Sequence, residues 1–304
     1  MKEDTDPINL YEPRVFTSKF MPSPELVARL KGDVNKFLIV RVEDMYKHVT
    51  RPVPATRATI HSMLFLTSGA ATMKIGSDTY TIQPGQVLIV PAGQVFSFCE
   101  KDVNRGYLCS FHDDFLIGKF SSERLKDFEF LRVWGNPRIS LDAQTGQFVE
   151  HLFSRILLDY AEYGLNNLDI IQPYLITLLC EINRAYTPMS GSTQTSAVSL
   201  TNRFKELLFT HVRTHHRVTD YATLLHITPN HLNKTVKAIT GKSPTKWIDE
   251  AIVLEAKVLL SQRTTSISLV AADVGFTDQA YFTRLFKKQE GITPSTFQKM
   301  IDLS

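Results

Sequence analysis

Near its C-terminus the chain contains one segment twice, fifty residues apart, and this duplication constrains the fold more than any other feature. With that shift, the matching pairs are Ala222 with Ala272, Leu232 with Phe282, Lys234 with Arg284, Val236 with Phe286, Lys237 with Lys287, Gly241 with Gly291, Pro244 with Pro294, and Trp247 with Phe297. Repeat architectures need three or more stacked copies to bury a core. Two copies therefore predict a duplicated small module.

Each copy has the pattern of a helix, a tight turn and a second helix, at about 218–240 and about 268–290. The expected N-terminal caps are Thr219 and Thr228 in the first copy and Ser268 and Asp278 in the second, because short polar side chains accept the free N–H groups of a helix start. The expected turns are His226-Ile227 and Gly275-Phe276. Gly241 and Gly291 should end the second helices, since glycine readily adopts the left-handed conformation found there.

The second helix of each copy has one apolar face and one polar face. The polar faces carry Asn230, Asn233, Lys234 and Lys237 in the first copy, and Gln279, Thr283, Arg284 and Lys287 in the second. Asn and Gln can bond adenine through two hydrogen bonds, and Arg and Lys can bond the acceptor edge of guanine. One such face is often an ordinary solvated surface, but two in register favour a helix-turn-helix that enters the DNA major groove.

A single helix is predicted between the two copies, over PTKWIDEAIVLEAKVLLS. Its roughly 18 residues span about 27 Å, which with the flanking turns could hold two helices about one DNA turn (roughly 34 Å) apart. Residues 199–304 contain 14 Lys and Arg against 9 Asp and Glu, a net charge of +5, whereas the rest of the chain has −2. The basic bias is compatible with double-stranded DNA as partner.

Residues 199–304 resemble the DNA-binding domain of the AraC/XylS family of bacterial transcription regulators. The resemblance is strongest over SISLVAADVGFTDQAYFTRLFKKQEGITPSTFQ, and the first copy matches through Ala222, Leu232, Lys237, TGKSP and EAKVLL. It implies that Asn230, Asn233, Lys234, Gln279, Ala280, Thr283 and Arg284 lie near base edges and Lys237 and Lys287 near phosphates, with His231 as a further DNA-binding candidate. The chain departs from the family pattern at Ile252, where an arginine is usual, and at Val236 and Ala238. These departures predict weaker DNA binding or different packing of the first module.

Before this domain, the segment Tyr186 to Ser199 reads YTPMSGSTQTSAVS and has the composition of a linker. We therefore expect an N-terminal domain at 1–186, a linker at 187–198 and a DNA-binding domain at 199–304. From Phe37 to Phe111 short β-rich runs alternate with turn signals, which favours a β-sandwich or small barrel, and 147–186 has helical periodicity. The predicted fold class is α+β multidomain, with an all-α C-terminal domain.

The strand-rich segment more weakly resembles the cupin-like effector domain of the same family, which implies a barrel with flanking helices. Cupin enzymes hold a metal with a His-x-His pair, a Glu and a later His, but only His61 matches, and Phe96 stands at the later histidine position. A metal site needs three or four convergent ligands. We therefore expect no metal, no cofactor and no enzymatic activity, and a hydrogen-bonded structural role for His61.

Three interpretations of the N-terminal domain remain open. The barrel interior could hold a small-molecule effector, with PRVFTSKFMPSPELVARL as an arm or lid, or the domain could serve only to form a homodimer through helices 147–186. An enzymatic cupin with a vestigial helical domain is the alternative from another class. A regulator that activates transcription would also contact RNA polymerase.

Several features predict a cytoplasmic protein. The chain is 43% apolar and 21% charged, as soluble globular proteins are, and it has no apolar run long enough to span a membrane. MKEDTDPINL lacks the apolar core of a secretory signal. Three cysteines in no metal-ligand spacing suit a reducing compartment.

Overall fold

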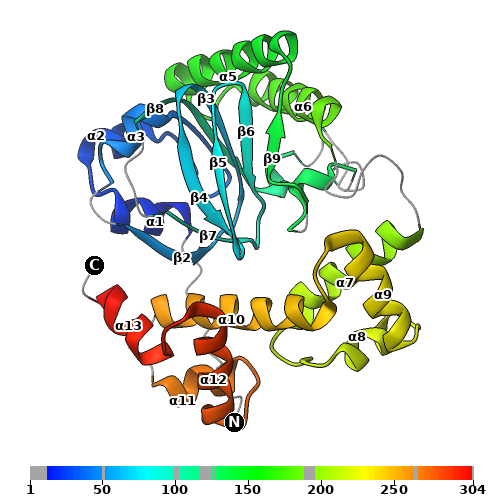
Figure 1. Ribbon diagram of the computed structural model, residues 1–304. Helices are drawn as coiled ribbons and strands as arrows, with labels where there is room; N and C mark the ends of the chain where they lie inside the picture. Colours follow the sequence, from blue (N-terminus) through cyan, green and yellow to red (C-terminus); the bar gives the residue numbers. More distant parts are fainter. Residues whose placement is uncertain are drawn as a thin grey trace, which may run out of the picture. The chain divides into compact units, whose positions relative to one another are not determined.

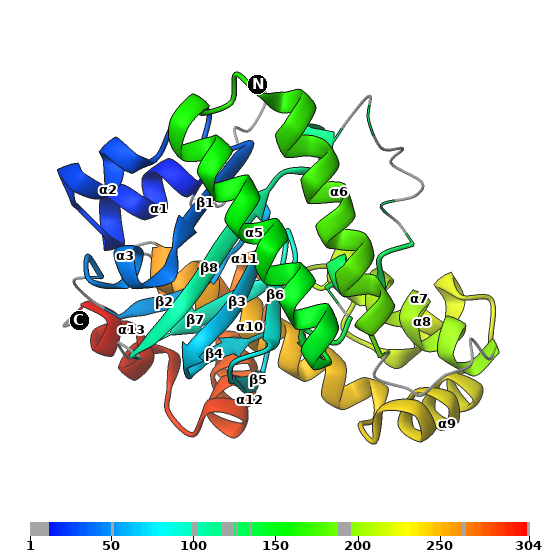
Figure 2. The ribbon, with the colours of Figure 1, turned by 90° about the horizontal axis from the view of Figure 1, so that it is seen from above.

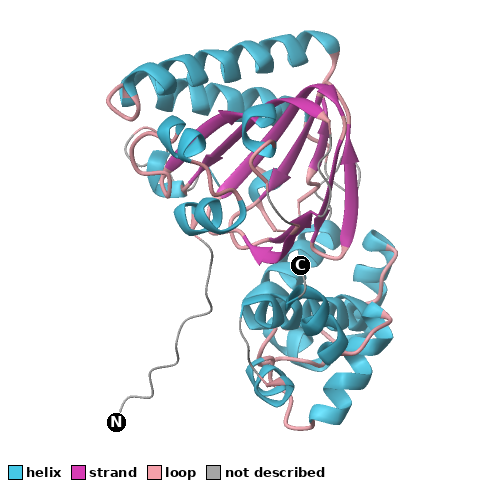
Figure 3. Ribbon diagram, turned by 90° about the vertical axis from the view of Figure 1, so that its left-hand side faces the viewer, coloured by secondary structure: helices cyan, strands magenta, loops and turns pink. Residues whose placement is uncertain are grey.

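The computed structural model describes residues 12–49, 52–98, 103–116, 119, 125, 127–133, 135–187, 196–262 and 266–302. The chain forms two compact units, one within Leu10–Pro188 and one within Met189–Ser304. The first unit combines strands with helices, and the second is helical (Figure 3). Among the described residues no helix is both long and apolar enough to cross a lipid bilayer.

Two antiparallel sheets form the centre of the first unit (Figure 1). The five-stranded sheet has the order β1 (Phe37–Arg41), β8 (Asn104–Phe111), β3 (His61–Gly69), β6 (Gln86–Val90) and β9 (Arg138–Ser140). The four-stranded sheet has the order β2 (Val53–Arg57), β7 (Val95–Phe98), β4 (Ala71–Ile75) and β5 (Asp78–Ile82). The predicted fold class is confirmed, although in the described ranges the ladders form two sheets and not one closed barrel.

The five-stranded sheet is buried on both faces, which explains its continuous apolar runs. On one face, Leu64 and Leu88 pack with Ile75 and Ile82 of the other sheet. On the other face, the alternate residues Met63, Phe65, Val87 and Ile89 pack against the helices. Because successive side chains of a strand point to opposite faces, a shift of one residue in register would exchange the two cores.

Helices cover the sheets on two sides. α5 (Ala143–Tyr163) and α6 (Leu168–Ala185) lie across the outer face of the five-stranded sheet (Figure 2). The short helices α1 (Pro13–Phe20) and α2 (Pro24–Arg29) precede β1, and α3 (Val42–Tyr46) follows it. The 3-10 turns η1 (Asp113–Leu116) and η2 (Glu129–Leu131) follow β8. The sheets between these helices enclose the interior of the unit.

The second unit consists of seven helices in the described part of the chain. They are α7 (Ser196–His211), α8 (Val218–Leu224), α9 (Pro229–Thr240), α10 (Pro244–Gln262), α11 (Ile267–Asp273), α12 (Gln279–Glu290) and α13 (Pro294–Asp302). One apolar cluster connects them and includes Phe204, Tyr221, Ile252 and Phe282. This unit therefore has its own hydrophobic core.

Candidate DNA-binding surface and ligand cavity

The helical unit is built from two similar three-helix groups, α7–α8–α9 and α10–α11–α12. The long helix α10 extends from the first group into the second (Figure 1). The start of α10 follows α9 in the same way as α13 follows α12. Trp247 at the start of α10 and Phe297 in α13 occupy matching positions. In each group a buried lysine lies over that ring: Lys205 Nζ is 4.6 Å from the Trp247 centroid, and Lys257 Nζ is 5.4 Å from the Phe297 centroid. The tandem helix-turn-helix expected from the duplication is confirmed.

The pairing of Ala222 with Ala272 is wrong by one residue. The Ile227 N–H donates to the Ala222 carbonyl at 3.0 Å, and the equivalent Phe276 N–H donates to Ala271 at 2.8 Å. The copies are thus related by 49 residues before the turn and by fifty after it. The reason is that the second turn contains one more residue before its helix begins.

The two turns reach the same backbone conformation with different residues. His226 has φ 56° in the first turn, and Gly275 has φ 86° at the equivalent place in the second. Left-handed backbone is strained for residues with a side chain, so the first turn carries strain that the second avoids.

The caps of the second helices are confirmed. The Thr228 hydroxyl accepts the His231 N–H at 3.2 Å, and the Asp278 carboxylate accepts the Ala280 N–H at 2.7 Å. Gly241 and Gly291 end these helices with φ values of 72° and 77°, as expected.

The caps expected for the first helices are wrong, because both helices begin earlier than Thr219 and Ser268 allow. α8 starts after Arg217, whose N–H is accepted by the Asp220 carboxylate at 3.0 Å. α11 starts after Ser266, whose hydroxyl accepts the Leu269 N–H at 3.3 Å. In each case a side chain just outside or inside the first turn satisfies a free backbone N–H.

The second helices, α9 and α12, have the same sequence of buried and exposed positions along all twelve residues. Leu232 and Val236 in α9, like Phe282 and Phe286 in α12, are fully buried. The candidate residues on the opposite face are exposed at Asn230, His231, Lys234, Lys237, Gln279, Ala280, Arg284 and Lys287, and half-buried at Asn233 and Thr283. The fold therefore brings each predicted set to one outward face.

Tyr281 is a surface residue of α12 that the sequence reasoning missed. It is 53% exposed, and the Arg284 guanidinium carbon lies 5.9 Å from its ring centroid. Tyr281 matches His231 at the fifty-residue shift, so the repeat register itself was the signal that could have found it.

Buried contacts hold the two groups together. Arg213, before α8, donates two hydrogen bonds to Glu255 of α10, at 2.6 and 3.0 Å. The His216 ring stacks on Phe276 of the second turn, with centroids 4.7 Å apart. Burial lowers the pKa of His216 below its usual value. These contacts restrict the orientation of α9 relative to α12.

Ile252 is 1% exposed and belongs to the core of the helical unit. An apolar side chain at this position of α10 therefore contributes to packing and does not reach the outward face. Val236 is buried in the same core, whereas Ala238 is exposed.

The first unit contains a cavity of about 120 Å³ between the two sheets. Helices α1, α2 and α3 cover it. Its apolar lining includes Phe16, Met21, Leu26, Leu30, Leu38, Val40, Met45, Leu64, Met73, Leu88, Val90, Phe96, Phe98 and Leu108. Concave sites lined mainly by apolar side chains are where proteins commonly bind small molecules.

His61 has a structural role. Its Nδ1 accepts the Ala92 N–H at 3.1 Å, so Nε2 carries the proton and donates to Asp113 at 2.9 Å. This hydrogen bond lowers the pKa of Asp113. Within the described ranges no three His, Cys, Asp or Glu side chains gather in a way that could hold a metal ion.

A helix-turn-helix domain family matches residues 221–300. The arabinose operon regulatory protein of Salmonella typhimurium is 23% identical over 253 residues, which cover 76% of this chain and 80% of that protein. The arabinose operon regulatory protein of Escherichia coli is 38% identical over 72 residues, covering 24% of this chain and 25% of that protein. The transcriptional regulator ExsA of Pseudomonas aeruginosa is 28% identical over 115 residues, covering 36% and 41%. The matched residues therefore cover less than half of the length of each of the last two relatives.

Among solved structures, ToxT from Vibrio cholerae is similar with a TM-score of 0.45 and 15% identity, over 87% of this chain and 98% of that one.

Proposed function

This chain belongs to the AraC/XylS family of DNA-binding transcription regulators, and from that premise we propose that α9 and α12 enter successive major grooves of one duplex. The observation that carries the proposal is the matched exposure of the two helices, each with a buried apolar face and an outward polar face. α10 has 19 residues and is roughly 28 Å long. That length suits two helices about one DNA turn, roughly 34 Å, apart.

The outward residues take two roles in this proposal. Asn230, Asn233, Gln279 and Arg284 have the hydrogen-bonding groups that discriminate base edges. Lys237 and Lys287, one turn further along their helices, neutralise phosphates and position the helices without reading sequence. His231, Lys234, Ala280, Tyr281 and Thr283 complete the contact surface.

The test uses the full chain and an operator selected from random duplexes. Arg284→Ala should weaken operator binding by about 1–3 kcal/mol and relax base preference at one position. Lys287→Ala should weaken binding to all duplex sequences alike and reduce the salt dependence of binding by about one counterion. The control Arg203→Ala removes an exposed positive charge from α7 and should leave the base preference and the salt dependence of binding unchanged. Unchanged binding in both α12 variants would refute major-groove entry.

We also propose a homodimer formed through α5 and α6. Phe148 and Leu158 of α5 are 46% and 61% exposed, and a second subunit could cover these apolar side chains. Linking two subunits raises the effective concentration of each DNA-binding unit at paired half-sites. Leu158→Glu should shift sedimentation from dimer to monomer, and a wild-type monomer at micromolar concentration would contradict the proposal.

The cavity supports an effector as the regulatory signal, rather than an N-terminal domain that only dimerises. An effector regulates DNA binding when it prefers one arrangement of the protein over another. The relatives are transcription regulators, and we propose no catalytic activity for this chain. Activation through RNA polymerase and a cytoplasmic location complete the proposal.

A further inference from the structure

On the outward face of α12, the side chain of Tyr281 lies beside that of Arg284. The two residues are three positions apart in the sequence, so their side chains leave the helix on the same face. The Arg284 guanidinium carbon lies 5.9 Å from the centroid of the Tyr281 ring, within the range in which a ring attracts a cation. Both side chains are exposed. The ring therefore restricts the guanidinium at a surface that a duplex can reach.

The Tyr281 ring is itself supported by the second turn. Its centroid lies 5.6 Å from that of Phe276, which packs against the core of the helical unit and stacks on His216 with centroids 4.7 Å apart. The loop that contains His216 approaches the turn so closely that a Cβ at Gly275 would lie 2.1 Å from the Arg213 carbonyl oxygen. A series of contacts thus extends from the junction of the two groups to the outward face of α12, and it fixes the position of the Tyr281 ring.

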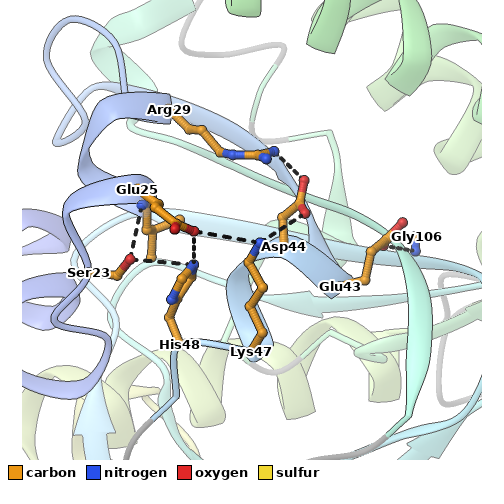
Figure 4. Close-up of polar contacts among 9 residues, drawn as sticks. Ser23, Glu25, Arg29, Glu43, Asp44, Lys47, His48 and Gly106 are labelled. Carbon is orange, nitrogen blue, oxygen red and sulfur yellow. Dashed lines mark hydrogen bonds and ion pairs between the residues drawn. The ribbon is translucent and has the colours of Figure 1, made fainter.

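Arg284 is held in a different way from an arginine in an ion pair. Within the described part of the chain, no carboxylate pairs with Arg284. Arg29 of α2 shows the alternative, because its guanidinium is paired with the carboxylate of Asp44 (Figure 4). A carboxylate accepts the N–H donors that would bond the acceptor edge of guanine, whereas a ring attracts the cation through its π face. The contact with Tyr281 therefore restricts Arg284 and leaves its N–H donors for a base.

The first group has different residues at the three equivalent positions. In place of Phe276, Tyr281 and Arg284 it has Ile227, His231 and Lys234. Isoleucine at the turn cannot support a ring by stacking. Lysine carries a compact charge on a flexible stem and lacks the planar fork that bonds guanine at two points. The arrangement that orients a guanidinium therefore belongs to α12 and not to α9.

From these contacts we infer that Tyr281 is a positioning residue for base recognition, whose ring holds the Arg284 guanidinium in the orientation that bonds guanine. The inference rests on the proposal that α12 enters a major groove. A side chain that is already restricted loses less rotamer entropy when it binds. This advantage is realised where Arg284 meets its preferred base pair, so Tyr281 increases specificity for the operator more than affinity for DNA in general.

Competition titrations of the full chain test this role through the ratio of operator affinity to non-operator affinity. Tyr281→Leu should lower the ratio about two- to fivefold, which corresponds to the loss of one exposed contact between a ring and a cation. The loss should be confined to the base pair whose preference Arg284→Ala relaxes. Tyr281→Phe keeps the ring and should retain the wild-type ratio. Both variants should bind a non-operator duplex as the wild type does, which also shows that they are folded.

A double-mutant cycle with Arg284→Ala separates positioning from direct contact with the duplex. When Arg284 is absent, Tyr281→Leu should no longer change the ratio, because the group that the ring positions is gone. The control Arg29→Ala removes an exposed ion pair from α2 and should change neither affinity. An unchanged ratio in Tyr281→Leu, or the same decrease with and without Arg284, would overturn the inference.

The Arg284→Ala variant separates this inference from the proposed function. A ratio that falls in Arg284→Ala but not in Tyr281→Leu would refute the positioning role alone. A ratio unchanged in Arg284→Ala would refute base reading by α12, and the positioning role with it.

Discussion

Replacing Gly275 by alanine should destabilise the helical unit much more than the same replacement at Gly291. Both glycines have left-handed backbone, with φ values of 86° and 77°, so alanine costs about 1–2 kcal/mol at either site. At Gly291 an added Cβ meets nothing within 4 Å. At Gly275 it would lie 2.1 Å from the Arg213 carbonyl oxygen and 2.7 Å from His216 Cε1.

The clash at Gly275 involves backbone and cannot be relieved by a side-chain rotation. Overpacking of this kind adds about 1–3 kcal/mol. The expected free energy of unfolding therefore falls by about 2–5 kcal/mol for Gly275→Ala and about 1–2 kcal/mol for Gly291→Ala. In a domain of roughly 100 residues, the difference corresponds to a further Tm decrease on the order of 10 °C.

Thermal unfolding of the full chain, followed by far-UV circular dichroism, measures this difference. Because two units can unfold separately, hydrogen exchange of the α8 and α11 amides should accompany it. A Gly275→Ala variant no less stable than Gly291→Ala would refute the close approach between the second turn and the loop before α8.

Three further outcomes are expected. His226→Gly should raise the free energy of unfolding by up to about 1 kcal/mol in urea titration, because relief of left-handed strain exceeds the entropy cost of glycine. Burial lowers the pKa of His216 from 6.5, so the unfolded chain binds the proton more tightly than the folded chain does. The free energy of unfolding should therefore fall as the pH decreases below 6.5. His216→Phe should reduce this pH dependence in the same titration. Glu255→Ala should lower the free energy of unfolding by about 3 kcal/mol, since the Glu255 side chain is 4% exposed and its loss leaves Arg213 without that carboxylate. Lys246→Ala, which removes an exposed ion pair at 4.0 Å, should lower it by less than about 0.5 kcal/mol. Equal decreases in denaturant titration would contradict this expectation.

The candidate DNA-binding face was predictable because it depends on local chemistry. Apolar residues three and four apart define the buried side of α9 and α12, and Thr228 and Asp278 are caps that any helix start favours. The predicted starts of α8 and α11 were wrong because several polar residues compete for the same free N–H groups. In the folded chain the N-cap residues are Arg217 and Ser266.

The sequence by itself determined the duplication, the helix-turn-helix pattern and the outward polar residues, since periodicity and capping act over a few residues along the chain. Only the tertiary structure decided the rest. The contact of His216 with Phe276 and the lining of the cavity join residues far apart in the chain or on different strands. Their proximity depends on strand register and loop packing, which are set by the whole core and leave no local pattern.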